Sequence, residues 1–243
     1  MSGHSKWSTI KRKKGATDAK RAKVFAKLAR EVGIAVRAGG PVADLNPRLR
    51  MILLKCRSAN MPADNIDRAI KRAAGDDDSA NFEELTYEIF APGGVAVLVH
   101  AHTDNRNRTA SDVRHLVTKA GGQLASAGAV TRLFERKGQI IIERAAADEE
   151  TLMELALEAG ADDFTSDENG YEIVTEPNDF EQVHKAVEEK GIATLSAEVT
   201  SIALQTTAVD DSGAATVTRL VDALEENDDV SDVFTNADFP EGD

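Results

Sequence analysis

The chain of 243 residues is long enough for one large domain or for two to three small ones, and 42% hydrophobic with 29% charged residues is ordinary for a globular protein. No apolar stretch approaches the roughly 20 residues that a membrane-spanning helix needs, so we expect no membrane partner. The single cysteine excludes an internal disulfide and fits a reducing compartment. Since the basic, polar N-terminus carries no secretory signal, we expect a cytoplasmic protein.

The net charge of −13 is divided very unevenly along the chain. Residues 1–75 contain 18 Lys and Arg against 5 Asp and Glu, a net of +13, so the remaining residues carry −26. A block of one sign at one end is typical of a segment that binds a polyanion, and nucleic acid is the commonest polyanion in a cytosol. The alternative is a basic helical face that rests against the acidic parts of the same protein.

The N-terminal segment combines strong positive charge with one aromatic residue. Residues 1–15 show neither helical nor strand periodicity and contain Trp7 beside a run of four cations. We expect this arm to fold onto phosphates while Trp7 stacks on a base. The alternative is a frayed terminus in which Trp7 packs against the first helix.

A first helix is predicted from Thr17 to the stop signal Gly39-Gly40-Pro41. Its apolar residues recur at spacings of three and four, and its basic residues fall on the opposite arc. One face can therefore join a core while the other faces phosphate. Together with the arm, this face supplies the predicted nucleic-acid-binding residues: Lys6, Trp7, Lys11, Arg12, Lys13, Lys14, Lys20, Lys23, Lys27 and Arg30.

Two further amphipathic helices complete a predicted three-helix bundle. Asn46 and Pro47 are typical of a helix start, the first as N-cap and the second in the first turn. Asn60-Met61-Pro62 ends this helix and opens a third, which Gly75 closes. Cys56 lies on an apolar stripe and is expected to be a core residue, not a nucleophile.

The sequence next predicts a hairpin of residues 86–90 and 95–102, joined by a type II turn with Gly93 at its centre. A loop then leads to a helix capped by Thr109 and Asp112. Backbone N–H groups at a helix start favour an anion, so the loop is a candidate anion-binding site. Alternatively its residues only shape a turn and pair with local carboxylates. The candidate loop residues are Asn105, Arg106, Asn107 and Arg108.

Residues 138–200 are expected to form a separate unit in the order β-α-β-β-α-β, which is typical of the ferredoxin-like fold. A strand at 202–206, a helix at 214–226 and a strand at 230–234 should return to the hairpin. The predicted domains are residues 1–78, residues 79–136 with 202–243, and an inserted domain of residues 137–201. Residues 148–190 hold 15 acidic residues against two lysines; we expect this surface to keep the protein soluble, or else to face basic protein.

Few residues suggest chemistry. His100, His102 and Asp104 could hold a metal, but no further ligand motif is near them. No phosphate-binding glycine loop, dinucleotide motif or nucleophile elbow occurs. We therefore expect no enzyme, no catalytic residues, no metal, no cofactor and no small-molecule substrate.

Four segments together span nearly the whole chain: GHSKWSTIKRKKGATDAKRAKVF, NPRLRMILLKCRSANMPADNIDRAIKRAAG, the stretch from YEIFAPGG to RLFERKGQI, and the C-terminal helix and strand. In these segments the chain resembles the YebC/PmpR family. The resemblance implies an α+β protein, with an N-terminal three-helix bundle followed by two α/β domains, the third ferredoxin-like and inserted in the second. The family more usually has aliphatic residues in place of His100 and His102. It often has Gly-Ser-Val before an aromatic residue where this chain has residues 128–132.

The resemblance implies a nucleic-acid-binding regulator of gene expression, customarily a DNA-binding transcriptional regulator. The alternative is a ribosome-associated translation factor, because a mitochondrial relative is a translational activator of cytochrome c oxidase. Such a factor would bind ribosomal RNA and assist the synthesis of difficult peptides. The absence of a recognition helix favours RNA over DNA. A third hypothesis, a metal-dependent hydrolase, would use His100, His102 and Asp104.

Overall fold

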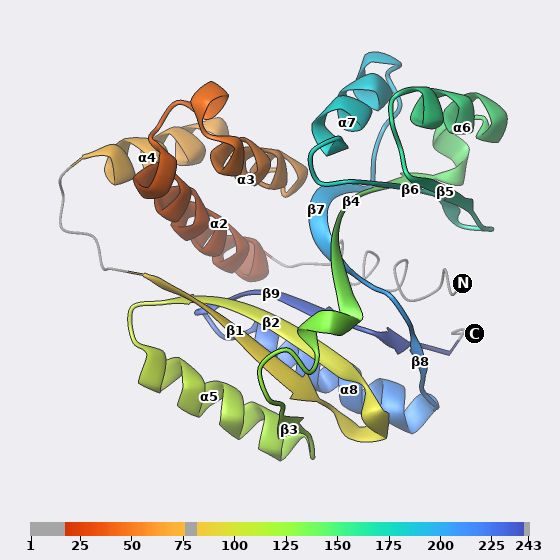
Figure 1. Ribbon diagram of the computed structural model, residues 1–243. Helices are drawn as coiled ribbons and strands as arrows, with labels where there is room; N and C mark the ends of the chain where they lie inside the picture. Colours follow the sequence, from red (N-terminus) through yellow and green to blue (C-terminus); the bar gives the residue numbers. More distant parts are fainter. Residues whose placement is uncertain (1–17, 76–81, 241–243) are drawn as a thin grey trace. The chain divides into compact units, whose positions relative to one another are not determined.

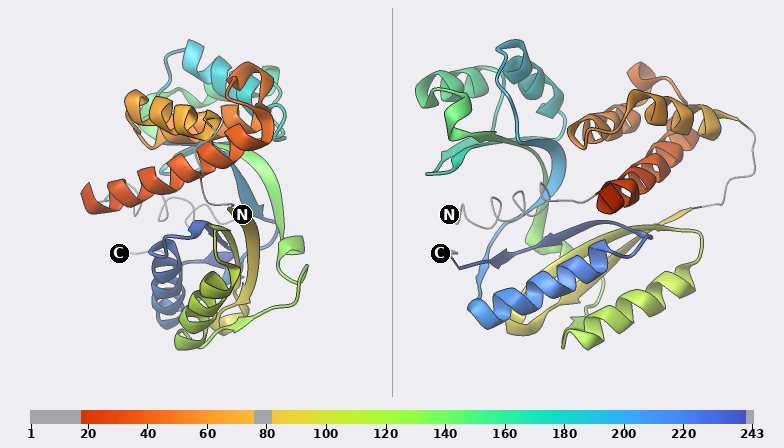
Figure 2. Two further views of the ribbon diagram at one scale, coloured as in Figure 1. Left: turned by 90° about the vertical axis from the view of Figure 1, so that its left-hand side faces the viewer. Right: turned by 180° about the vertical axis from the view of Figure 1, so that it is seen from behind.

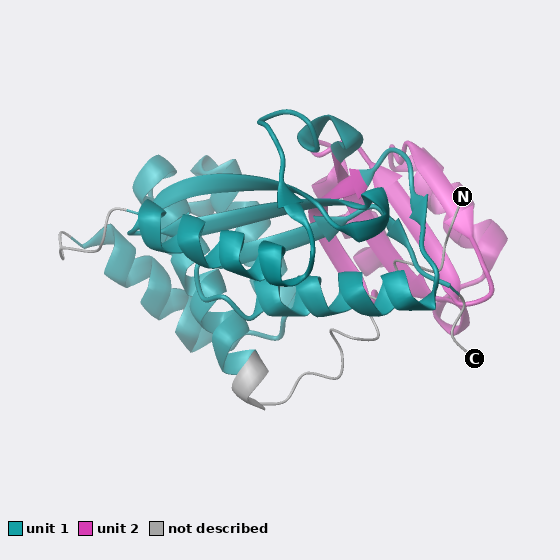
Figure 3. Cartoon of the chain, turned by 90° about the horizontal axis from the view of Figure 1, so that it is seen from below, with its two compact units in different colours: residues 1–5, 16–135, 203–243 teal, residues 6–15, 136–202 magenta. Residues whose placement is uncertain are grey.

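The computed structural model describes residues 18–75 and 82–240, and these divide into two compact units. One unit contains residues 18–75, 82–135 and 203–240, and the other contains residues 136–202 (Figure 3). Helices and largely antiparallel sheets are both present, so the predicted α+β class is confirmed. Among the described residues, none of the helices has both the length and the apolar character that crossing a bilayer requires.

The three predicted helices of the bundle are present as α2 (Asp18–Gly39), α3 (Pro47–Ser58) and α4 (Ala63–Ala74), with the 3-10 turn η1 (Ala43–Leu45) between the first two. Their shared core contains Leu28, Val32 and Leu49, and the lone Cys56 is buried with them. Burial raises the pKa of the Cys56 thiol to about 11, which is the opposite of activation.

Asn46 joins the first two helices. Its side-chain oxygen accepts from the backbone N–H of Leu49 at 3.0 Å, which makes it the predicted N-cap of α3. Its amide nitrogen donates to the carbonyls of Ala35 and Gly40, each at 2.8 Å. A single buried side chain therefore satisfies backbone groups at the end of α2 and at the start of α3.

The same unit contains a four-stranded sheet in the order β3-β1-β2-β9. Its strands are β1 (Glu83–Phe90), β2 (Ala96–Thr103), β3 (Gln123–Leu124) and β9 (Val230–Thr235). Figure 1 and Figure 2 show α5 (Arg106–Lys119) and α8 (Asp211–Glu225) on one face of the sheet and α2 on the other. The core on the α5 and α8 side includes Ile89, Val97, Val113 and Leu220.

The predicted β1–β2 hairpin is present, with Pro92 and Gly93 at its turn. Gly93 has φ 81° and ψ 8°, the values that the second central residue of a type II turn requires. The predicted strand at residues 202–206 is wrong. One strand, β7, ends at Ala203, and the next is the short β8 (Thr207–Ala208), which pairs in parallel with β10 (Ala237–Asp238).

Residues 136–202 form the unit that the sequence predicts as ferredoxin-like. Its strands are β4 (Phe134–Glu143), β5 (Asp163–Ser166), β6 (Gly170–Thr175) and β7 (Ser196–Ala203), and its helices are α6 (Glu149–Glu158) and α7 (Phe180–Glu189). The strand order β5-β6-β4-β7 is that of the split βαβ fold. Since β4 enters the unit and β7 leaves it, the unit is inserted into the chain of the other one.

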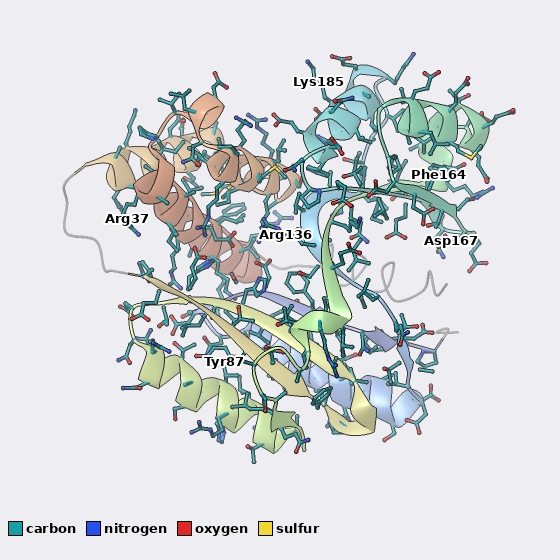
Figure 4. All side chains as sticks on the ribbon, in the orientation of Figure 1. Arg37, Tyr87, Arg136, Phe164, Asp167 and Lys185 are labelled. Atoms are coloured by element: carbon teal, nitrogen blue, oxygen red, sulfur yellow. The ribbon has the colours of Figure 1, made fainter. Side chains whose placement is uncertain are left out.

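Close packing fixes α7 on the sheet of the inserted unit. A Cβ at Gly138 would lie 2.7 Å from Phe180 of α7, so no larger residue fits between this strand and the helix. Phe164 stacks on Tyr171 with ring centroids 5.8 Å apart, and Asp167 accepts from the backbone N–H groups of Asn169 and Gly170 in the β5–β6 turn. Figure 4 labels Phe164 and Asp167 in this hairpin.

Candidate nucleic-acid interface

The structure describes only part of the predicted interface. Six of its residues lie outside the described residues, and of Lys20 only the backbone, within α2, is described. The geometry therefore concerns Lys23, Lys27 and Arg30, which point from α2 toward the end of α8. The six residues outside are Lys6, Trp7, Lys11, Arg12, Lys13 and Lys14.

These three cations contact one short segment, Glu225–Asp229, which we call the acidic turn. Lys27 Nζ donates to the carbonyl of Glu225 at 2.6 Å, and Lys23 Nζ donates to the carbonyl of Glu226 at 3.3 Å. Arg30 Nη1 donates to the carbonyl of Asp228 at 2.8 Å and to the carbonyl of His102 at 3.0 Å. In the right-hand view of Figure 2, the first half of α2 lies beside the end of α8.

The chemistry of a helix end explains this contact. The last carbonyls of α8 have no partner within the helix and form the negative end of its dipole. The last turn of α8 contains no basic residue, and the acidic turn adds carboxylates at the same place. Lys23 Nζ lies 3.6 Å from the Glu226 carboxylate and 3.9 Å from that of Asp228. Cations from α2 thus supply the positive charge that this helix end lacks.

The three cations differ in how firmly they are placed. The Lys23 side chain is 48% exposed, whereas the Arg30 side chain is 23% exposed and lies 4.8 Å from the ring centre of Phe82. Lys27 is partly buried, and this burial lowers the pKa of its ammonium although Asp228 and Glu225 oppose the shift. Contact with the acidic turn is therefore weakest at Lys23 and strongest toward Arg30.

The predicted anion-binding loop forms the first turn of α5, which begins earlier than expected. Asn105 is the N-cap, and its side chain accepts from the backbone N–H of Arg108 at 3.1 Å. The predicted capping box of Thr109 and Asp112 is wrong, because Thr109 lies inside the helix and its hydroxyl contacts Asp229. Arg106 lies 3.5 Å from the Glu83 carboxylate, and Asn107 is exposed.

The Asp229 carboxylate lies at the start of this helix. One of its oxygens accepts from Thr109 Oγ1 at 2.7 Å and from Arg108 Nη2 at 2.8 Å, and Arg30 Nη1 lies 3.6 Å from the other. The Asp229 side chain is only 8% exposed. Burial alone would raise its pKa, but hydrogen bonds from Arg108 and Thr109 outweigh burial and lower it.

The two predicted basic sites thus meet at one place. The basic arc of α2 and the start of α5 both contact the acidic turn or its last residue, Asp229. Sequence reasoning did not identify this segment, although it contains a signal. Acidic residues in and after the last turn of a helix oppose the helix dipole, so such a segment calls for cations from elsewhere. Whether Lys23, Lys27 and Arg30 also contact nucleic acid stays a prediction.

Other exposed cations of the bundle were not singled out by their spacing. Arg57, Lys71 and Arg72 are exposed, and their side chains form no hydrogen bond or ion pair with the residues that the structure describes. Lys71 and Arg72 lie in the last turn of α4 and Arg57 in that of α3. These side chains remain accessible to a ligand while α2 contacts the acidic turn.

The two histidines of β2 are placed apart from any cluster of ligands. The His100 ring packs edge-on against Phe234 at 5.3 Å, and His102 Nε2 lies 3.9 Å from the Glu84 carboxylate. Burial lowers the pKa of His102. Within residues 18–75 and 82–240, His, Cys, Asp and Glu side chains form no group of three or more that could hold a metal ion.

A buried carboxylate also fixes the turn at residues 128–132. Glu88, 8% exposed, accepts from the backbone N–H groups of Gly128, Val130 and Thr131. Burial would raise the pKa of Glu88, but these bonds favour the ionised form and lower it. Hydrogen bonds from these three backbone N–H groups to Glu88 therefore hold the turn in its conformation.

Comparison with known proteins finds similarity to one family along nearly the whole chain. Residues 5–76 match the TACO1/YebC protein N-terminal domain, and residues 82–237 match the TACO1/YebC second and third domain. A protein of Hathewaya histolytica is 50% identical over 100% of this chain and 99% of its own length, and one of Rubrobacter xylanophilus is 51% identical over 99% and 97%. Both are named "Probable transcriptional regulatory protein".

A solved structure agrees with this assignment. The crystal structure of a conserved hypothetical protein from Aquifex aeolicus has a TM-score of 0.81 to this chain at 46% sequence identity, covering 93% of each chain. Family models and relatives of this identity cover both the basic bundle and the two following domains. The chain belongs to the TACO1/YebC family.

Proposed function

We propose that this protein is a nucleic-acid-binding regulator of gene expression that acts in the cytoplasm. The observation that carries the proposal is the separation of charge, with +13 in residues 1–75 and −26 in the rest of the chain. Nucleic acid would meet the N-terminal arm and the cations of the bundle, while the acidic remainder repels it. No catalytic role is included, because the buried Cys56 thiol and the separated histidines offer no activated group.

The first mode is DNA-binding transcriptional regulation, which the names of the relatives suggest. Lys11 to Lys14 and the exposed bundle cations would contact phosphates and fix the position of the protein on the duplex. Contacts of this kind supply affinity with little sequence information. A transcriptional role would then depend on the shape of the duplex or on a partner for the choice of site.

The second mode is a ribosome-associated translation factor, and the structure of the bundle favours it. A helix that reads a major groove presents free side chains near its N-terminus. In α3 this part contains Arg48 and Arg50, which contact Glu84 and the carbonyls of η1, and the first turn of α4 carries Asp64. Structured RNA is recognised by shape and phosphate position, which do not require such a helix.

Binding measurements on the full chain test the shared part of the proposal. Fluorescence anisotropy would follow duplex DNA and a structured ribosomal RNA fragment over a range of salt concentrations. Replacing residues 11–14 by alanine should weaken binding and reduce the slope of log K against log salt by roughly 0.7 to 0.9 for each lost phosphate contact. The matched control replaces four exposed cations elsewhere, Arg114, Lys119, Lys185 and Lys190, and should change the slope little.

Sedimentation of cell lysate through a sucrose gradient separates the two modes. Co-migration with ribosomes that survives DNase treatment supports the translation factor and argues against promoter binding. A position at the top of the gradient, under conditions that keep weak ribosome binders attached, supports the DNA mode. Equal salt slopes for the alanine variant and wild type would contradict a role for the arm in either mode.

A further inference from the structure

The acidic turn offers the cations of α2 the kind of oxygen atoms that a nucleic-acid backbone would offer. Lys27 and Lys23 bind carbonyl oxygens at 2.6 and 3.3 Å, and carboxylates of Glu226 and Asp228 lie within 4 Å of Lys23. Phosphates present similar negative oxygens to lysine. An N–H group that donates to the acidic turn is not available to a phosphate, so the two compete for the same donors while these contacts persist.

The acidic turn is held firmly by α5 and the sheet, whereas its exposed carboxylates make only a loose contact with Lys23 of α2. Asp229 is bonded to Arg108 and Thr109 of α5, and the backbone N–H of His102 donates to the Asp229 carbonyl at 2.8 Å. By contrast, the side chains of Glu226 and Asp228 that face Lys23 are 58% and 76% exposed. Exposed ion pairs are weak and are screened by salt. If the contact opens, the acidic turn should stay with the sheet and separate from α2.

We propose that the acidic turn, Glu225–Asp229, is an internal competitor of nucleic acid for the basic face of α2. In the free protein it accepts hydrogen bonds from Lys23, Lys27 and Arg30. A polyanion that already contacts the arm and the exposed bundle cations Arg57, Lys71 and Arg72 displaces the acidic turn. It then binds the three cations of α2 as well. This inference rests on the proposed function and adds its regulation: affinity depends on how readily the turn separates from α2.

A pair of charge-matched variants tests the competition in the full chain. The releasing variant, Glu226→Gln with Asp228→Asn, weakens the contact with Lys23 and leaves every cation in place. The control, Glu154→Gln with Glu158→Gln, changes the net charge equally at two exposed positions of α6 whose side chains have no partner among residues 18–75 and 82–240. The probes are a duplex DNA and a structured ribosomal RNA fragment.

The releasing variant should bind the better probe roughly two- to tenfold more tightly than the control, which is the effect of weakening two exposed ion pairs. Its affinity should differ most from the control at low salt, where those pairs are strongest in the wild-type chain. Equal affinities for the two variants would overturn the inference, because the gain would then come from net charge alone. Failure of wild type and both variants to bind either probe would instead refute the proposed function itself.

Hydrogen exchange gives an independent readout of the displacement. In the free protein the backbone N–H of Asp229 donates to the Asn227 side chain at 2.9 Å, and that of Asn227 donates to the Leu224 carbonyl at 3.1 Å. Saturating nucleic acid should speed amide exchange in residues 225–229, because the turn loses its cover of lysine and arginine side chains. Unchanged or slower exchange there, with binding confirmed, would overturn the inference.

Discussion

We expect Asp229 to contribute more to stability than its neighbours in the acidic turn. Its carboxylate is almost fully buried and bonds to Arg108, Thr109 and Thr103, with Arg30 beside it. Asp229→Asn removes a charge that two guanidinium groups face, so we expect a loss of about 2–4 kcal/mol in the free energy of unfolding. Asp228→Asn is the control, since its exposed side chain should matter by less than about 0.5 kcal/mol. Urea unfolding measures both.

The same carboxylate should make stability depend on pH. Because the folded-state pKa of Asp229 is lowered, its contribution is present above the unfolded pKa of about 3.9 and is lost as the pH falls through the lower folded value. The stability difference between wild type and Asp229→Asn should therefore shrink as the pH drops below about 4. A difference that stays constant down to pH 2 would contradict the assigned network.

Glu88 should control the turn at residues 128–132. Glu88→Gln places an amide where three backbone N–H groups need acceptors, so at least one of these donors loses its partner. We expect a loss of about 1–3 kcal/mol and faster amide exchange at Gly128, Val130 and Thr131. Glu84→Gln, on the same strand but exposed, is the control and should leave that exchange unchanged.

Two helix caps allow a comparison of local and tertiary roles. Asn46→Ala removes the cap of α3 and also leaves the carbonyls of Ala35 and Gly40 without their donor, so we expect a loss of about 2–3 kcal/mol. Asn105→Ala removes a single cap bond at the exposed start of α5 and should lose about 1 kcal/mol. Thermal or urea unfolding that gave equal losses would contradict the bridging role of Asn46.

The caps also show what the sequence could predict. Asn46 lies next to its helix, so its residue type and Pro47 sufficed to place the start of α3. The start of α5 was misplaced because Thr109 resembles a cap, whereas its hydroxyl bonds to Asp229, 120 residues away. The strand β3 was missed because two residues carry no periodicity and form a strand only by pairing with β1. Local signals were sufficient for most helices, and long-range contacts decided the exceptions.

The candidate interface, too, could be predicted where local signals define it and not where long-range contacts do. Charge and helical spacing placed Lys23, Lys27 and Arg30 on one arc of α2, and the structure puts all three beside the same segment. Their partner lies about 200 positions away in sequence, so no spacing could indicate it. Of the two interpretations open on sequence grounds, contact with the protein's own acidic residues is present in the structure. If the acidic turn competes with nucleic acid for these cations, both interpretations hold: the cations contact the acidic turn in the free protein and nucleic acid in the complex.

The insertion of residues 136–202 predicts that this unit can be weakened alone. Leu152 of α6 is fully buried within it, so Leu152→Ala should cost about 2–5 kcal/mol, and amide exchange should rise within residues 136–202. The amides of β1 and β2 should keep their protection, because their core lies in the other unit. Val99→Ala, in the core of the other unit, should raise amide exchange in β1 and β2 and leave amide exchange within residues 136–202 unchanged. Since the proposed interface lies in the basic bundle and the arm, Leu152→Ala should also leave nucleic-acid affinity unchanged, and a large loss of affinity would place part of the interface on the acidic unit.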